Sequence, residues 1–114
     1  MADVGSRGER AALEVYLRRG YRLIARNWRS RIGELDLVLA RDGIVVFCEV
    51  KARRGSRLGG PFEAVGPAKQ RKLRALAEAF LLAHRLAAEG VRFDVASVVV
   101  SSAGPRVHVF EDAF

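Results

Sequence analysis

Acidic and basic side chains lie inside two segments whose alternating apolar pattern predicts β-strands. Residues 33–51, "GELDLVLARDGIVVFCEVK", contain four such side chains, which are Glu34, Asp36, Glu49 and Lys51. Asp42 and Gly43 separate the two segments, and Asp-Gly in this position is a strong signal for a two-residue hairpin turn. That turn sets the register, so Asp36 should face Glu49 and Glu34 should face Lys51.

Two opposed carboxylates are a chemical problem, because Asp36 and Glu49 would repel one another across the hairpin. Burial would then force one of them to hold a proton, unless a cation lies between them. Mg²⁺ or Mn²⁺ prefers oxygen ligands, and the main-chain carbonyl of Val50 would complete a partial shell with the two carboxylates. Lys51 could orient or deprotonate a bound water and offset charge on a phosphate, which is the chemistry of phosphodiester hydrolysis. The alternative is a solvent-exposed face whose charges are merely hydrated.

The composition limits the fold and the partners. A chain of 114 residues with a formal net charge of +7 forms one domain, residues 1–114, and its charge favours a partner that carries phosphates. The single Cys48 excludes an internal disulfide and any multi-cysteine zinc site, so a reducing compartment is expected. The chain shows no secretion signal and no apolar run long enough to cross a bilayer. We therefore expect a cytoplasmic protein without a membrane contact.

Hydrophobic periodicity predicts the elements that must position these side chains. A mobile arm over residues 1–8 should precede a helix that ends at Gly20 and buries Leu13, Tyr16 and Leu17. A second helix should begin at Pro67 and continue until Gly90, after a loop over residues 54–66. Strands are expected at residues 21–29, 33–40, 43–53, 91–100 and 107–112. The order αβββαββ predicts an α/β fold around one mixed sheet.

A cluster of cations precedes and opens the second helix, where the helix dipole makes each positive charge mildly unfavourable. A helix start also attracts phosphate through its free N–H groups, so the cluster could form an anion-binding rim. Its members are Arg53, Arg54, Arg57, Lys69, Gln70, Arg71, Lys72 and Arg74. Lys69 or Gln70 could also reach the reacting phosphate. The alternative is a hydrated basic face.

Four residues elsewhere in the chain could contribute to the site or have only a structural role. Glu9 lies four residues before Leu13, so it either joins the metal ligands from the first helix or only favours the positive helix start. His84 and His108 lack ligand-spaced partners and are expected to be structural. Trp28, between two arginines, could stack on a base but is expected to pack.

The longer sequence pattern resembles a known family. The segments "GYRLIARNWR", "GELDLVLARDGIVVFCEVKARR", "LGGPFEAV", "KQRKL" and "VRFDV" are similar to the YraN-like family of small bacterial proteins, a predicted nuclease group of the PD-(D/E)XK superfamily. The resemblance implies a fold like that of archaeal Holliday-junction resolvases, which act as homodimers. It assigns Asp36, Glu49 and Lys51 to the superfamily motif, with Leu35 in place of the usual proline. Asp94 matches the family pattern without an assigned role.

The hypothesis from the sequence is a nuclease that uses Mg²⁺ or Mn²⁺ to hydrolyse nucleic-acid phosphodiesters. The expected substrate is DNA, with branched DNA and RNA left open. The alternatives are a non-catalytic nucleic-acid-binding protein of the same fold and a basic interaction module in a larger complex. A pure binder would not need an opposed acidic pair within a basic surface, so the enzyme is the preferred interpretation.

Overall fold

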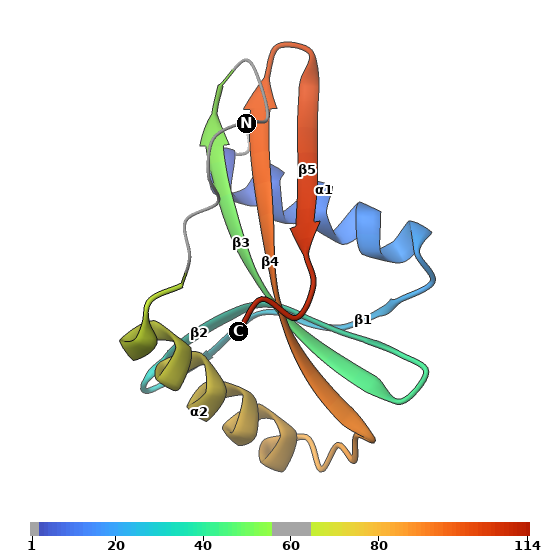
Figure 1. Cartoon of the computed structure of the whole chain (residues 1–114), viewed down its shortest axis with the longest axis vertical. Coiled ribbons are helices and arrows are strands. Elements are labelled where there is room, and N and C mark those ends of the chain that lie inside the picture. Colours follow the sequence, from blue (N-terminus) through green and yellow to red (C-terminus); the bar gives the residue numbers. More distant parts are fainter. Residues whose placement is uncertain (1–2, 56–64) are drawn as a thin grey trace.

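The computed structural model describes residues 3–55 and 65–114 and has the predicted order of elements (Figure 1). The elements are α1 (Val4–Arg18), β1 (Arg22–Ser30), β2 (Gly33–Arg41), β3 (Ile44–Arg54), α2 (Pro67–Ala83), β4 (Gly90–Ser101) and β5 (Gly104–Phe110). The predicted α/β class and the order αβββαββ are confirmed. Within the described ranges, no helix is both long enough and apolar enough for a membrane crossing.

The five strands form one mixed sheet in the order β1-β2-β3-β4-β5. Only β3 and β4 run parallel, and the other three neighbouring pairs are antiparallel. Asp42 and Gly43 have φ values of 51° and 80°, the pair of positive angles that a type I′ turn requires. The predicted hairpin register is confirmed from the turn to the last paired residues, Leu37 and Cys48.

The two helices cover opposite faces of the sheet, so alternate residues of each strand enter different cores (Figure 1). Leu37, Leu39, Val46 and Cys48 lie in the core beneath α1. Their neighbours Val38, Ala40, Val45 and Phe47 lie in the core beneath α2. Leu35 departs from this alternation. Strand alternation would place Leu35 on the face of Leu37, but it packs in the α2 core, where β2 is no longer paired with β3.

The first helix begins earlier than predicted. Asp3 is its N-cap, and the side chain of Asp3 accepts a hydrogen bond of 2.7 Å from the backbone N–H of Ser6. Residues 4–8 are therefore helical, and the expected arm over residues 1–8 is wrong for this part. Leu17 is 48% exposed and does not belong to the buried stripe. A Cβ on Gly8 would collide with Ala52, so this glycine lets α1 lie directly against β3.

The second helix ends at Ala83, well before Gly90, and β5 begins at Gly104 within the segment that was expected to be a turn. His84 stops the helix: its ring stacks on Phe80 with 3.9 Å between ring centroids, and its Nδ1 lies 3.0 Å from the Phe80 carbonyl oxygen. Trp28 packs edge-on against Phe80 at 5.2 Å. The structural roles predicted for His84 and Trp28 are confirmed.

Candidate active site

The site lies at a fork in the sheet, where β2 and β3 separate. Their pairing ends at Leu37 and Cys48, after which β2 continues alongside β1 and β3 continues alongside β4. Asp36 and Glu49 are the first residues beyond the last pair. The fork therefore places both carboxylates where the sheet opens, and it frees backbone groups that a continuous ladder would use.

Asp36 forms a hydrogen bond with one of these unpaired backbone groups. Its Oδ2 accepts a hydrogen bond of 2.9 Å from the backbone N–H of Val50, so the carboxylate is fixed between the diverging strands. Burial, and then the negative charge of Glu49, raise the pKa of Asp36 from 3.8 to about 7. Glu9 and Glu34 add smaller contributions in the same direction, and the Val50 N–H opposes them. The carboxylate conflict inferred from the hairpin register is thus present in the folded chain.

Three carboxylates from two elements converge at the fork. Glu9 of α1 and Glu34 and Asp36 of β2 each offer an oxygen, and these oxygens lie within 4.8 Å of one another. All three side chains are partly buried. Glu9 therefore does more than favour the start of α1, because the helix carries its carboxylate to Asp36. Oxygen ligands at this spacing fit Mg²⁺ or Mn²⁺, and the charge of the ion would offset both causes of the raised pKa of Asp36, first its burial and then its negatively charged neighbours.

Glu34 has a different partner from the one predicted. It forms an ion pair of 3.0 Å with Arg29 of β1, and Arg29 is also its register partner in the sheet. The expected pair with Lys51 is wrong, because the β2–β3 ladder ends before it reaches these two residues. The sequence held the missed signal. The parity of Glu34 and Asp36 had already placed them on one face of the hairpin, but Glu34 was assigned to Lys51 and not to the carboxylates.

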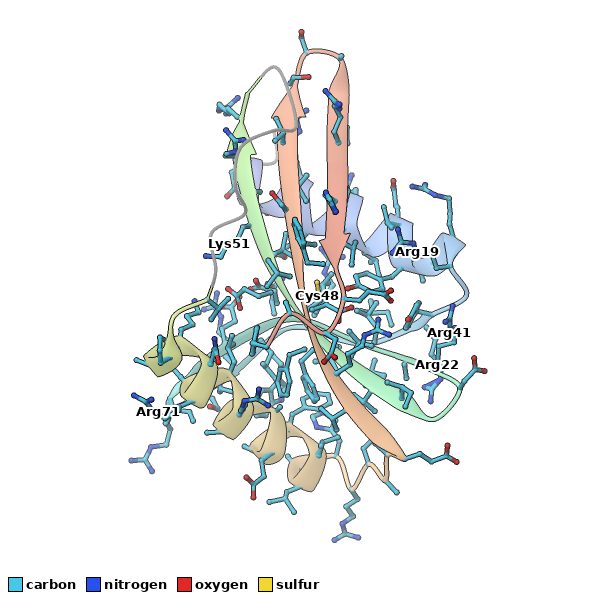
Figure 2. The ribbon with its side chains drawn as sticks, in the orientation of Figure 1. Arg19, Arg22, Arg41, Cys48, Lys51 and Arg71 are labelled. Carbon is cyan, nitrogen blue, oxygen red and sulfur yellow. The ribbon has the colours of Figure 1, made fainter. Side chains whose placement is uncertain are left out.

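Lys51 projects from β3 beyond the fork. In Figure 2 its side chain leaves β3 on the side away from β4 and β5. Across the part of the chain that the structure describes, the ion pairs within 4.0 Å do not include Lys51. An ammonium group without a carboxylate partner, two residues from Glu49 on the same strand, is available to an anionic ligand.

The first turn of α2 contacts the site through Lys69. Lys69 forms an ion pair of 3.4 Å with Glu49, whose side chain is only 13% exposed. Gln70 holds the helix start in place by donating a 2.7 Å hydrogen bond from Nε2 to the Val65 carbonyl. The sequence placed Lys69 near the reacting phosphate but did not predict its contact with Glu49. Gln70 uses its amide N–H within the protein, so this group is not directed at a ligand.

Most of the predicted basic cluster flanks the fork. Arg53 and Arg54 are exposed at the end of β3, and Lys69, Arg71, Lys72 and Arg74 are exposed on α2. Figure 2 shows Arg71 extending away from the sheet at the beginning of α2. Arg74 instead lies over the rings of Phe93 and Phe114, 4.9 and 5.7 Å from their centroids. Arg57 lies outside the described residues.

A buried polar network holds α1 in position. Asp94 of β4 has no exposed surface, and its carboxylate accepts hydrogen bonds from Tyr16 Oη at 2.7 Å and from Arg92 Nε and Nη2 at 2.8 Å each. Arg92 also donates to Tyr21 Oη at 2.9 Å. Tyr16 lies two helical turns after Glu9, so this contact sets the rotation of α1 and the direction of Glu9. Asp94, which had no role in the sequence analysis, is a structural anchor for the site.

The wall behind the carboxylates is largely apolar. Asp36 and Glu49 border a cavity of about 10 Å³, room for roughly one water. Its other lining residues are Leu35, Phe47, Cys48, Leu73, Phe93 and Phe114. An apolar wall lowers the local dielectric constant, which strengthens the attraction of these carboxylates for a cation.

Comparison with known proteins identifies the family. The model described as "Uncharacterised protein family UPF0102" matches residues 8–98. A UPF0102 protein of Symbiobacterium thermophilum is 48% identical and aligns with 97% of this chain and 95% of its own length. A UPF0102 protein of Clavibacter michiganensis is 45% identical over the same shares of the two chains. One from Mycolicibacterium gilvum is 48% identical, over 85% of this chain and 80% of its own length. The predicted resemblance to the YraN-like family is confirmed, and the chain belongs to the UPF0102 family.

Proposed function

We propose that this protein is a metal-dependent nuclease that hydrolyses phosphodiester bonds of DNA. The observation that carries the proposal is the group of carboxylates at the fork, set in a chain of net charge +7. Partly buried carboxylates that repel one another destabilise a fold unless a bound cation neutralises them. A divalent metal ion, which prefers oxygen ligands, is such a cation. Exposed cations on both sides of the group would hold the phosphates of the substrate.

The proposed ligands are Asp36 and Glu9, which belong to the observed group of three carboxylates, together with Glu49, which that group does not include, and the main-chain carbonyl of Val50. Glu34, the third member of the group, is paired with Arg29. When bound, Mg²⁺ or Mn²⁺ would polarise the phosphate and lower the pKa of a water. The Val50 N–H keeps Asp36 in one orientation, and Lys69 holds Glu49. Neither carboxylate therefore needs to be ordered when substrate arrives, so less conformational entropy is lost on binding.

Lys51 is the proposed catalytic cation. In hydrolysis, a water adds to phosphorus and one P–O ester bond breaks, so negative charge builds on the phosphate oxygens in the transition state. An ammonium group without a carboxylate partner can stabilise that charge without first losing a salt bridge. Arg53 and Arg54, exposed farther along the same strand, would hold the next phosphates of the backbone.

Cleavage of end-labelled DNA by wild type and by Lys51→Ala tests the proposal. Wild type should cut DNA with Mn²⁺ and stop cutting with EDTA. Lys51→Ala should bind DNA but cut roughly 10²- to 10³-fold more slowly, the loss typical of a removed transition-state contact. Arg106→Ala, an exposed cation on β5, is the matched control and should cut at the wild-type rate. Equal rates for Lys51→Ala and Arg106→Ala would refute the catalytic role of Lys51. Binding of DNA by wild type without cleavage would support the non-catalytic binding protein instead.

A further inference from the structure

The tip of the β1–β2 hairpin presents an exposed apolar residue that directly follows two arginines, Arg29 and Arg31. Ser30 and Gly33 are paired, so Arg31 and Ile32 form the turn. Ile32 is 50% exposed, and the Arg29 side chain before it is 79% exposed. A single exposed isoleucine is ordinary on a protein surface. Ile32 differs from such a residue because its hairpin packs against α2 and leads into the carboxylates at the fork.

The tip is held firmly against α2. A Cβ on Gly33 would lie 2.8 Å from Lys72 Cε and 3.2 Å from Leu76 Cδ1, and Gly33 has a φ of 156°, which favours glycine. The base of the tip therefore lies close to α2, and the Ser30–Gly33 pair closes it. A tip that is already ordered loses little conformational entropy when it binds.

The tip also lies at a defined distance from the carboxylates. Glu34 and Asp36 follow Ile32 on the same chain, and a strand rises about 3.4 Å per residue. Ile32 is thus on the order of 10 to 14 Å from Asp36. Stacked bases are about 3.4 Å apart along one strand, so this distance corresponds to roughly three or four nucleotides. The ion pair between Arg29 and Glu34 connects the base of the tip to the three carboxylates at the fork.

We propose that this tip is a wedge that inserts Ile32 between stacked bases where a DNA duplex opens, and so selects junctions of paired and unpaired DNA. The inference deepens the proposed function and rests on it for the identity of the ligand. Apolar side chains inserted at a base step partly unstack it, and a step beside unpaired nucleotides is already easy to open. Arg29, Arg31 and Lys72 would hold the flanking phosphates. The wedge would place the bond to be cut about three or four nucleotides from the opened step.

A fluorescent base analogue tests the wedge without any cleavage. A forked duplex would carry 2-aminopurine at the branch, and binding would be followed in EDTA, where hydrolysis is absent. Wild type should raise the fluorescence as the base unstacks, and it should prefer the fork to plain duplex. Ile32→Ala should lose the fluorescence rise and roughly tenfold of the preference for the fork, because the shorter side chain cannot hold the base step open. Leu82→Ala, an exposed leucine on α2, is the control and should behave as wild type.

If Ile32→Ala raises the fluorescence as wild type does, or if wild type binds the fork without any rise, the wedge is refuted. The proposed nuclease then still stands on its own cleavage assay. Conversely, a fluorescence rise that depends on Ile32, in a protein that fails to cut DNA with Mn²⁺, would support the wedge and refute the nuclease. A wild-type protein that binds no DNA would overturn both. In the presence of Mn²⁺, wild type should cut about three or four nucleotides from the branch, and Ile32→Ala should cut at scattered positions.

Discussion

Replacing Asp36 with asparagine should make the metal-free protein more stable. The amide oxygen of Asn can still accept the 2.9 Å hydrogen bond from the Val50 N–H, while the negative charge beside Glu49 is lost. The folded state raises the pKa of Asp36 from 3.8 to about 7, a difference of about 3 units. At about 1.4 kcal/mol per unit, the ionised carboxylate destabilises the fold by at most about 4 kcal/mol. Because the side chain is partly exposed, solvent screening reduces this value, and direct like-charge repulsion alone accounts for about 1 kcal/mol.

The effect of Asp36→Asn should depend on pH in one direction. A carboxyl group with a raised pKa in the folded state binds its proton more tightly there than in the unfolded chain. Its favourable contribution is complete below the unfolded value of 3.8 and is lost as the pH rises through about 7. Asp36→Asn should therefore match wild type near pH 4 and exceed it by about 1 to 4 kcal/mol at pH 8.

Urea denaturation in EDTA from pH 4 to pH 8 would measure this difference. Asp42→Asn is the matched control, because Asp42 is in the exposed turn with a side chain that is 87% exposed, and its φ of 51° suits asparagine. That control should show no comparable gain at pH 8. The reasoning is refuted if Asp36→Asn is less stable than wild type at pH 8, or if its gain is the same at both ends of the range.

The remaining predictions concern the α1 anchor and the basic cluster. Asp94→Ala should lower the free energy of unfolding by about 1 to 3 kcal/mol in a denaturation experiment, because it leaves the Tyr16 hydroxyl and the Asp112 N–H without their acceptor, while Arg92 keeps its ion pair with Glu111. A loss below about 1 kcal/mol would show that the network is not an anchor. The double variant Arg71→Ala with Lys72→Ala should flatten the log–log salt dependence of DNA binding by about one to two units. An unchanged slope would place the duplex elsewhere on the surface.

The sequence predicted the hairpin and its acidic pair well, because one local signal determines both. Asp42 and Gly43 set the turn, the turn sets the register, and the register brings Asp36 to Glu49. The sequence failed where the sheet departs from a regular ladder. Nothing in the alternation of residues 33–51 indicates that β2 pairs with β3 only from Leu37 onward, so Glu34 was assigned to the wrong partner.

Contacts between residues that are far apart in the sequence could not be predicted either. Tyr16 and Asp94 are separated by 78 positions, and only the packing of α1 on the sheet brings them together. The contact of Lys69 with Glu49 depends in the same way on where α2 docks. The early start of α1 was different, because Asp3 is a recognisable N-cap residue and could have been read from the sequence.

Calorimetric titration of Mn²⁺ tests whether the carboxylates at the fork form a metal site, and it needs no substrate. Wild type should bind Mn²⁺ at a site that Asp36→Asn and Glu49→Gln each weaken by at least about 100-fold, since each would remove a direct ligand. The control Asp42→Asn should bind as wild type does. If Asp36→Asn and Asp42→Asn bind Mn²⁺ equally, or if wild type binds none, the carboxylates at the fork are not a metal site and the account is wrong.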